Sequence, residues 1–219
     1  MQKRAVILFT RIPIPGYTKT RLQPFLNEHE CCELHKAFIS DMYDTLRNVD
    51  ADIIISYEPN GDLDDLQRLV DEEAMFMPQR GERLGDRMHM SIVDALNDYE
   101  CCLLIGSDIP LISHEDMEAA FTILEERDVV LAPTEDGGYY LIGMKQPCEQ
   151  IFQIQYSTPT VMQNTLQAID DAGKTCGIGN LLFDIDEKDD LLKLVELLRV
   201  DGSYQCRQTR KTLSRIGKL

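Results

Sequence analysis

Short apolar runs rich in strand-forming residues alternate with helix-like segments along most of this chain. The strand-like runs are AVILFT (5–10), ADIIISYE (51–58), AMFMPQ (74–79), CCLLIGSD (101–108) and DVVLAP (128–133). The first helix is predicted to begin at Asn27, because Glu30 stands where a capping box needs it. Strict alternation with short connections implies right-handed crossovers and a mainly parallel sheet flanked by helices. The order therefore predicts an α/β fold.

The alternation changes after residue 133. The run VVLAPTEDGGYYLIGM (129–144) predicts two strands around a glycine turn, and a helix with Pro159 in its first turn follows. The last predicted elements are strands at 174–178 and 180–186 and a helix from Lys188. No repeat or linker interrupts the chain, so we predict one domain over residues 1–201. Residues 202–219 hold five cations and no acid, and we expect a basic, frayed or weakly docked C-terminal tail.

The composition excludes several classes of protein. The formal net charge of -16 repels the phosphates of nucleic acid over most of the surface, so we expect no nucleic-acid partner. No apolar run approaches the roughly 18 residues that a membrane span needs, and the N-terminal run is too short for a signal peptide. Seven cysteines without C-x-x-C spacing indicate reduced thiols in a cytoplasmic protein. The sequence does not indicate an oligomeric state.

A basic loop follows the first strand. The stretch TRIPIPGYTKTRLQP (10–24) contains Arg11, Lys19 and Arg21 but no acid. It is not a Walker phosphate loop, because Thr18 stands where that pattern needs a glycine. We predict that Lys19 and Arg21 contact a small anion such as a phosphate, and a solvated basic turn is the alternative.

Polar residues follow the later strands too, at 78–87, 106–110, 134–139 and 184–186. Ligands of open parallel sheets bind beyond the carboxyl ends of the strands, so these five segments are predicted to form one site. Asp108 follows a buried strand and suits a hard divalent metal that also contacts substrate oxygens, unless it is only a turn aspartate. Either Asp184 or Asp186 is expected to provide the second metal ligand.

Two glycine-bearing loops complete the predicted site. In TEDGGYY, Gly137 and Gly138 predict a turn that also lets a ligand approach the backbone, and Asp136 is a candidate for a further role. In PQRGERLGDRM, Gln79 and Gly85 stand before a helix, where amide and backbone groups could read a base. An ordinary glycine-bearing loop is the alternative for this second segment.

The ordered motifs PGYTKTRL, PQRGERLGDRM, IGSDIPLI, APTEDGGYYLIGM and LFDIDEKDDL resemble the family called rSAM/selenodomain-associated transferase 1. The resemblance covers residues 1 to about 200. It implies the Rossmann-like nucleotide-diphospho-sugar transferase fold (A-type glycosyltransferase, GT-A). That wider fold also includes sugar-nucleotide pyrophosphorylases and guanylyltransferases.

The resemblance also implies roles for particular residues. A first-strand loop of the form G-x-G-T-R-[LM] holds nucleotide phosphates in the wider fold, and PGYTKTRL is similar at Thr20, Arg21 and Leu22 but lacks the paired glycines. A G-D-x-P-L motif carries the metal aspartate, which maps onto Asp108, and Asp186 is the best match for the second ligand. The predicted nucleotide-binding set is Gly16, Thr20, Gln79, Gly85, Gly137 and Gly138, of which the resemblance implies Thr20, Gln79 and Gly85.

These features predict a transferase that depends on Mg²⁺ or Mn²⁺ and uses a nucleotide-activated donor and a small-molecule acceptor. Lys19, Arg21 and Asp136 are the predicted catalytic residues. The family label favours glycosyl transfer from a nucleotide sugar. Nucleotidyl transfer from an NTP to a phosphorylated acceptor is the alternative, because Ser107-Asp108 supplies one acid where A-type glycosyltransferases usually have D-x-D. A nucleotide-binding protein without catalysis is a third reading.

Overall fold

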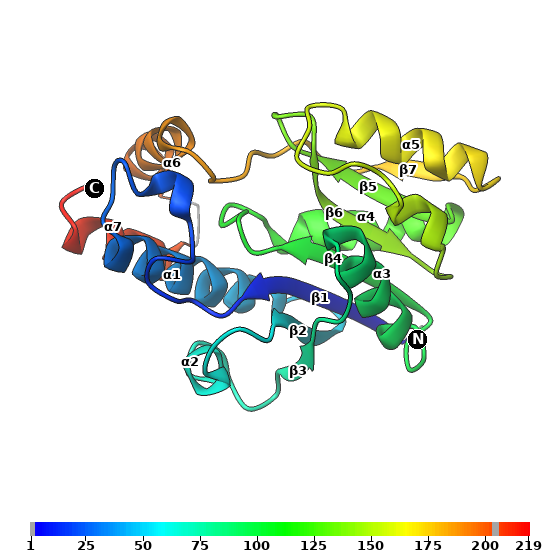
Figure 1. The fold of residues 1–219 in the computed structure, drawn as a ribbon, viewed down its shortest axis with the longest axis horizontal. Coiled ribbons are helices and arrows are strands. Elements are labelled where there is room, and N and C mark those ends of the chain that lie inside the picture. The colour runs from blue at the N-terminus through cyan, green and yellow to red at the C-terminus, as the bar shows by residue number, and fades with distance from the viewer. Residues whose placement is uncertain (1–2, 203–205) are drawn as a thin grey trace.

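The computed structural model describes residues 3–202 and 206–219, and in this part of the chain the central element is a seven-stranded sheet of order β3-β2-β1-β4-β6-β5-β7 (Figure 1). The strands are β1 (Arg4–Arg11), β2 (Asp52–Glu58), β3 (Met75–Pro78), β4 (Cys101–Gly106), β5 (Val129–Pro133), β6 (Tyr139–Met144) and β7 (Cys176–Ile178). Only β6 runs antiparallel to its neighbours. The predicted mainly parallel α/β fold is confirmed.

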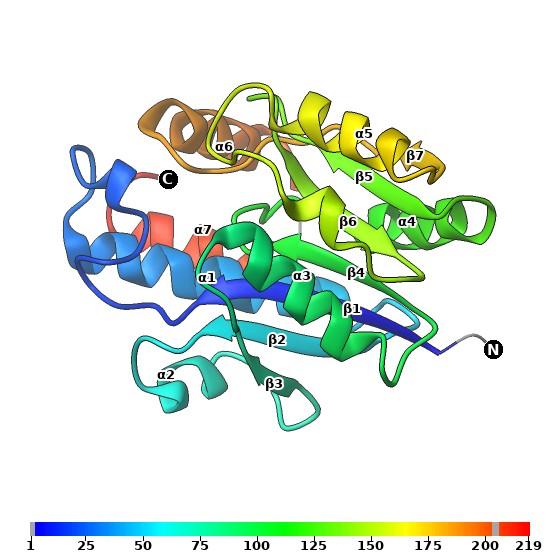
Figure 2. The same cartoon turned by 45° about the vertical axis from the view of Figure 1, so that its right-hand side comes forward.

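Alternation along the strands divides the core between the two faces of the sheet. Val6 and Leu8 of β1 pack with α1 and α4, whereas Ala5 and Ile7 pack with α3, α5 and the 3-10 helix η2 (Figure 2). The helices are α1 (Glu28–Leu46), α2 (Leu63–Gln67), α3 (Leu84–Ala95), α4 (His114–Glu126), α5 (Val161–Asp171), α6 (Lys188–Val200) and α7 (Arg207–Arg215), with 3-10 helices η1 (Thr20–Leu22) and η2 (Glu149–Phe152). Helices on both faces explain why the strands are continuously apolar.

Local sequence signals determine where several elements begin. The Asn27 side chain accepts a hydrogen bond from the Glu30 amide at 3.0 Å, and Glu30 accepts one from the Asn27 amide at 2.8 Å, as predicted. The predicted turn between β5 and β6 is also present, and it forms an antiparallel pair. The helix α5 begins at Val161, so the prediction that Pro159 lies in its first turn is wrong, and Pro159 lies in the loop before the helix.

The predicted strand at 180–186 is wrong. Only an isolated bridge between Thr134 and Leu182 forms there. The Leu182 amide donates to the Pro133 carbonyl at 3.2 Å, and the Ile185 amide donates to the Asp108 carbonyl at 3.0 Å. After β7 the chain therefore crosses the carboxyl ends of β5 and β4 instead of adding a strand, and this crossing segment (residues 180–186) carries Asp184 and Asp186 to those strand ends.

The expectation of a frayed or weakly docked tail is wrong for residues 206–219. Helix α7 lies along α1 (Figure 1), and Leu213 is fully buried. The Asp41 carboxylate of α1 accepts hydrogen bonds from the Gln208 amide at 2.8 Å and the Thr209 amide at 2.7 Å. Asp41 thus satisfies the free amides at the start of α7, which has no side-chain cap of its own. A tertiary contact of this kind has no local sequence signal.

Two predictions from composition can be compared with the described residues. All seven cysteines are free thiols, as expected, and five of them are buried. No helix in residues 3–202 and 206–219 combines the length and the apolar character needed to cross a bilayer.

Replacing Asp41 by alanine should lower the free energy of unfolding by about 1–2 kcal/mol, because two amides at the start of α7, that of Thr209 buried, lose their acceptor. Urea denaturation followed by circular dichroism measures the change. Asp44→Ala is the matched control, since Asp44 is exposed on the same helix. Equal stability of the two variants would contradict the role given to Asp41.

Candidate active site

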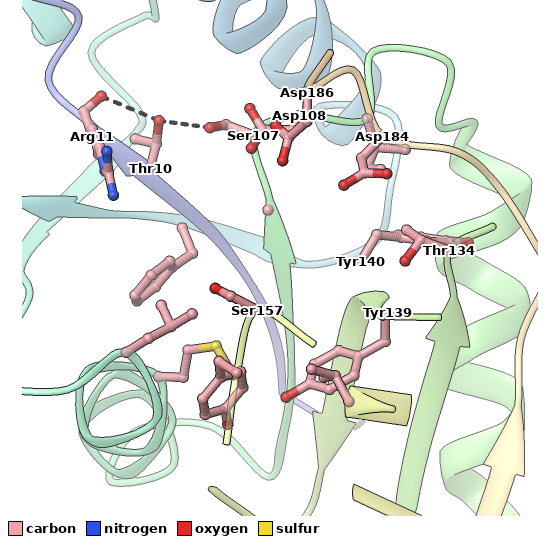
Figure 3. A pocket seen from close by; sticks show the side chains of 18 of the residues that line it. Thr10, Arg11, Ser107, Asp108, Thr134, Tyr139, Tyr140, Ser157, Asp184 and Asp186 are labelled. Atoms are coloured by element: carbon pink, nitrogen blue, oxygen red, sulfur yellow. Dashed lines mark hydrogen bonds between the residues drawn. The ribbon is translucent and has the colours of Figure 1, made fainter. Parts of the chain in front are cut away.

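A cavity of about 820 Å³ lies at the carboxyl ends of the parallel strands (Figure 3). All five segments predicted from the sequence contribute to its lining, which includes Thr10, Arg11, Lys19, Arg21, Glu58, Gln79, Arg87, Ser107, Asp108, Thr134, Asp136, Asp184 and Asp186. The predicted convergence of these strand ends is therefore confirmed. The amino end of the antiparallel β6 adds Tyr139 and Tyr140.

Lys19 connects two of these segments to the loop after β1. Its side chain is only 5% exposed, and its Nζ lies 2.5 Å from Asp108 Oδ1, 3.1 Å from Asp186 Oδ1 and 2.6 Å from the Ile185 carbonyl oxygen. These three contacts occupy all three donors of the ammonium group. The predicted contact of Lys19 with phosphate is therefore not available in this arrangement, and Lys19 instead holds the two predicted metal aspartates together.

The charges of this group stabilise one another. Burial would lower the pKa of Lys19, but Asp108 and Asp186 outweigh burial and raise that pKa above its ordinary value. Desolvation would raise the pKa of Asp108, but Lys19 beside it lowers that pKa below its usual range. Both groups are thus charged at neutral pH.

Asp184 lies among other carboxylates, whereas Asp108 lies beside the Lys19 ammonium group. Burial raises its pKa to about 6, and the nearby charges of Asp186, Asp136 and Asp108 raise it as well. Among the described residues, no cation lies within ion-pair distance of Asp184. The carboxylate is therefore held in an unfavourable field, as is common at functional sites.

Lys19 and Ser157 are the two non-glycine residues with positive φ in the described part of the chain, at 51° and 59°. Both line this cavity, although they are far apart in the sequence. Left-handed backbone at such residues costs about 1–3 kcal/mol and concentrates at functional sites. The sequence analysis missed Ser157, because the segment STPT suggested a helix start.

Three further cations line the cavity from β1, η1 and α3. Arg21 is 62% exposed and lies 3.5 Å from Asp186, and Arg11 is 67% exposed and lies 3.2 Å from Glu58. Arg87 also contacts Glu58, at 2.8 Å. The two exposed guanidinium groups are suited to binding phosphate oxygens bidentately.

A buried polar cluster that the sequence analysis missed lies beneath the carboxylates. The Thr10 hydroxyl donates to Ser107 Oγ at 2.9 Å (Figure 3) and lies 3.2 Å from His35 Nε2. Burial lowers the pKa of His35 to about 4, so the ring is neutral at pH 7. Thr10 and Ser107 could have been found from their positions beside Arg11 and Asp108, whereas His35 in the middle of α1 has no local signal.

Eight of the eleven predicted site residues line the cavity: Lys19, Thr20, Arg21, Gln79, Asp108, Asp136, Gly138 and Asp186. Gly16, Gly85 and Gly137 do not. A Cβ atom on Gly85 would lie 2.2 Å from the Phe152 carbonyl oxygen, and one on Gly137 would lie 2.1 Å from the Pro159 carbonyl oxygen. Gly85 therefore permits close packing of α3 against η2, and Gly137 permits close packing of the turn between β5 and β6 against the segment before α5.

Two of the lining residues also have structural partners. The Gln79 amide nitrogen donates to the Thr10 carbonyl at 3.0 Å and to the Ser56 carbonyl at 2.9 Å, which ties the ends of β1 and β2. Asp136 Oδ1 accepts from the Thr134 hydroxyl at 2.6 Å and the Gly138 amide at 3.0 Å, which closes the turn between β5 and β6. Base reading by Gln79 and catalysis by Asp136 stay predictions.

The carboxylates of Asp108, Asp184 and Asp186 are suited to a divalent cation that takes only one or two of its ligands from the protein. No group of three or more His, Cys, Asp or Glu side chains is arranged as a metal cage in residues 3–202 and 206–219. Mg²⁺ usually takes one or two carboxylates together with water and substrate phosphates. Asp108 and Asp186 already share the Lys19 ammonium group. A divalent cation would in addition offset the like charges around Asp184. The donor set thus fits Mg²⁺ or Mn²⁺ bound together with a substrate.

Gly85→Ala should lower the free energy of unfolding by about 1–3 kcal/mol, because the new methyl group would overlap the Phe152 carbonyl. Gly106→Ala is the control, since no heavy atom lies within 4 Å of a Cβ placed there. Chemical denaturation measures both variants. If Gly85→Ala were as stable as the wild type, the packing role of Gly85 would be wrong.

Asp184→Asn should stabilise the protein at pH 7 by about 1–2 kcal/mol, after allowance for solvent screening. The folded pKa of about 6 lies above the ordinary value of 3.8, so the unfolded chain ionises first and stability falls as the pH rises from 4 to 6. The stabilisation should therefore disappear near pH 4. Denaturation curves at several pH values measure it.

Asp186→Asn, two residues along, provides the matched control with the opposite sign. It removes one of the two carboxylates that pair with the buried Lys19 ammonium and should lower stability at pH 7. A destabilised Asp184→Asn variant would contradict the unfavourable field described for Asp184.

The chain is similar in sequence and in fold to known proteins. Residues 41–158, just over half of the chain, match the family described as "Uncharacterized protein conserved in bacteria (DUF2064)". A 2-phospho-L-lactate guanylyltransferase from Methanothermobacter thermautotrophicus is 31% identical over 131 residues. That match spans 58% of this chain and 57% of the length of the relative.

Solved structures resemble most or all of this chain in fold. A protein from Desulfovibrio desulfuricans G20, provisionally assigned as a nucleotide-diphospho-sugar transferase, aligns with a TM-score of 0.89 and 28% identity over 99% of this chain and 97% of that one. A Mycobacterium tuberculosis H37Rv protein, solved in complex with manganese, aligns with a TM-score of 0.56 and 11% identity over 90% of this chain and 99% of that one. The chain therefore belongs to the DUF2064 family and has the fold of the nucleotide-diphospho-sugar transferases.

Proposed function

We propose that the protein is a metal-dependent nucleotidyltransferase that joins an NTP to a phosphorylated small-molecule acceptor and releases pyrophosphate. The observation that carries the proposal is that one cavity holds both the exposed guanidinium groups of Arg11 and Arg21 and two carboxylates. These carboxylates belong to Asp108 and Asp186. A triphosphate and a divalent cation are complementary to these two charged groups. The guanylyltransferase relative makes GTP the first donor to test.

In this reaction an oxygen of the acceptor phosphate attacks the α-phosphorus, and the bond from that phosphorus to the pyrophosphate oxygen breaks. Negative charge increases on the leaving pyrophosphate. Arg11 and Arg21 would bind these oxygens, since their guanidinium groups are exposed at the cavity. Asp108 and Asp186 would hold Mg²⁺ or Mn²⁺, which when bound supplies further positive charge to the phosphate oxygens. Lys19 would act as a positioning residue for both carboxylates.

Glycosyl transfer, which the sequence favoured, becomes the second candidate. The likeness in fold to a provisionally assigned nucleotide-diphospho-sugar transferase supports it. The guanylyltransferase relatives and the single acid in Ser107-Asp108 favour nucleotidyl transfer. Membership of the narrower rSAM/selenodomain-associated group, a single domain over residues 1–201 and a cytoplasmic location stay predictions.

Incubation with Mg²⁺ and a panel of NTPs, sugar nucleotides and phosphorylated acceptors distinguishes the candidates. Pyrophosphate release is expected with an NTP and an acceptor. Release of a nucleoside diphosphate from a sugar nucleotide would instead identify a glycosyltransferase. Tight nucleotide binding, measured by calorimetry, without formation of any product would indicate a nucleotide-binding protein that is not an enzyme.

Asp108→Asn should reduce kcat/KM for pyrophosphate release by about 100-fold or more, because the reacting phosphates lose charge stabilisation. Asp170→Asn, on the exposed side of α5, should leave kcat/KM unchanged. Circular dichroism checks that both variants are folded, and calorimetry with and without Mg²⁺ measures nucleotide binding separately. Full activity in Asp108→Asn would exclude the role proposed for this carboxylate.

A further inference from the structure

The charges that line the cavity are divided between two walls. The four Lys and Arg residues in the described lining, Arg11, Lys19, Arg21 and Arg87, come from β1, the loop before and within η1, and α3. The opposite wall, here called the acceptor wall, is formed by Thr134, Asp136, Gly138, Tyr139, Tyr140, Tyr156, Ser157, Thr158, Pro159 and Val161. This wall contains no Lys, Arg or His, and Figure 3 shows Arg11 and Tyr139 on opposite sides of the pocket.

The division determines which substrate can lie where. A triphosphate requires cations, and the exposed guanidinium groups of Arg11 and Arg21 are both on the first wall. On the other side, the acceptor wall carries Asp136 but no cation, and Asp184 also lines the cavity. The cations that a triphosphate needs are thus on the first wall, so the second substrate, rather than the triphosphate, occupies the space beside the acceptor wall.

We infer that the body of the acceptor, beyond its reacting phosphate, is hydroxylated and carries no negative charge, so that phosphorylated carboxylic acids are poor acceptors. This inference rests on the proposed nucleotidyl transfer. An acceptor carboxylate beside Asp136 and Asp184 would have no cation from the acceptor wall to bind it. Hydroxyl groups, in contrast, can donate hydrogen bonds to these carboxylates.

The other residues of the acceptor wall agree with this chemistry. Tyr139 and Tyr156 line the cavity, and aromatic rings pack against the apolar faces of a polyol or sugar, whereas the Tyr140 hydroxyl donates to the Asn180 carbonyl at 3.2 Å. Ser157 is exposed and adds a hydroxyl group that can donate or accept. The wall therefore offers apolar contact and neutral hydrogen bonding together with one acid, Asp136, and Asp184 lines the cavity as well.

A matched pair of acceptors tests the inference. The two compounds are 2-phospho-L-lactate and propane-1,2-diol 2-phosphate, which differ only in a carboxylate replaced by a hydroxymethyl group. A second pair is 3-phosphoglycerate and glycerol 3-phosphate. With full-length protein, Mg²⁺ and the NTP that the panel identifies, we expect kcat/KM for pyrophosphate release to be at least 10-fold higher for the alcohol member of a pair.

Each other result has a distinct meaning. Equal or better turnover of the carboxylates overturns the inference and leaves nucleotidyl transfer standing, and so does reaction with other acceptors but with neither pair. Absence of pyrophosphate release with every NTP and acceptor overturns the proposed function and, with it, the inference.

A charge placed on the acceptor wall provides a second test. Thr158→Lys should raise the ratio of kcat/KM for 2-phospho-L-lactate to that for its alcohol analogue by at least 5-fold. Thr160→Lys, two residues along and outside the lining, should leave this ratio unchanged. Both substrates are measured on the same variant, so a loss of folded protein cancels in the ratio. An unchanged ratio in Thr158→Lys would mean that the acceptor lies elsewhere, and would overturn the inference.

Discussion

The buried ammonium group of Lys19 is the interaction on which the geometry of the site depends. It joins the loop after β1 to Asp108 at the end of β4 and to Asp186, 167 positions later in the chain. A buried ammonium without partners would be strongly unfavourable, so the three elements must come together. The backbone at Lys19 is left-handed, and the protein retains this conformation despite its cost.

Around this group of paired charges the protein keeps other charges that do not stabilise the fold. Asp184 lies among three other carboxylates. The guanidinium groups of Arg11 and Arg21 each contact one carboxylate but stay largely exposed to solvent. Such an arrangement is a poor solution for folding alone, because like charges raise the free energy of the folded state. It is a good solution for binding one substrate rich in negative charge and a cation beside it.

Much of the fold followed from local patterns. Continuous apolar runs such as AVILFT predicted the strands, and the rule that ligands bind at strand ends predicted the cavity. What the sequence could not reveal depends on distant contacts. The inward direction of Lys19 depends on Asp186, the docking of α7 depends on Asp41, and NLLFDID leaves the sheet because its amides bond to strand ends. His35 and Ser157 reach the site only through the tertiary fold.

The crossing segment separates the architecture of this protein from its chemistry. All seven described strands are complete at Ile178, before Asp184 and Asp186 occur in the chain. Two of the acids that face the cavity therefore belong to a connection, whose length and composition can vary without shifting any strand register. During evolution, substitutions in this connection can therefore change the ions and substrates that the site binds, while the sheet beneath it keeps its structure.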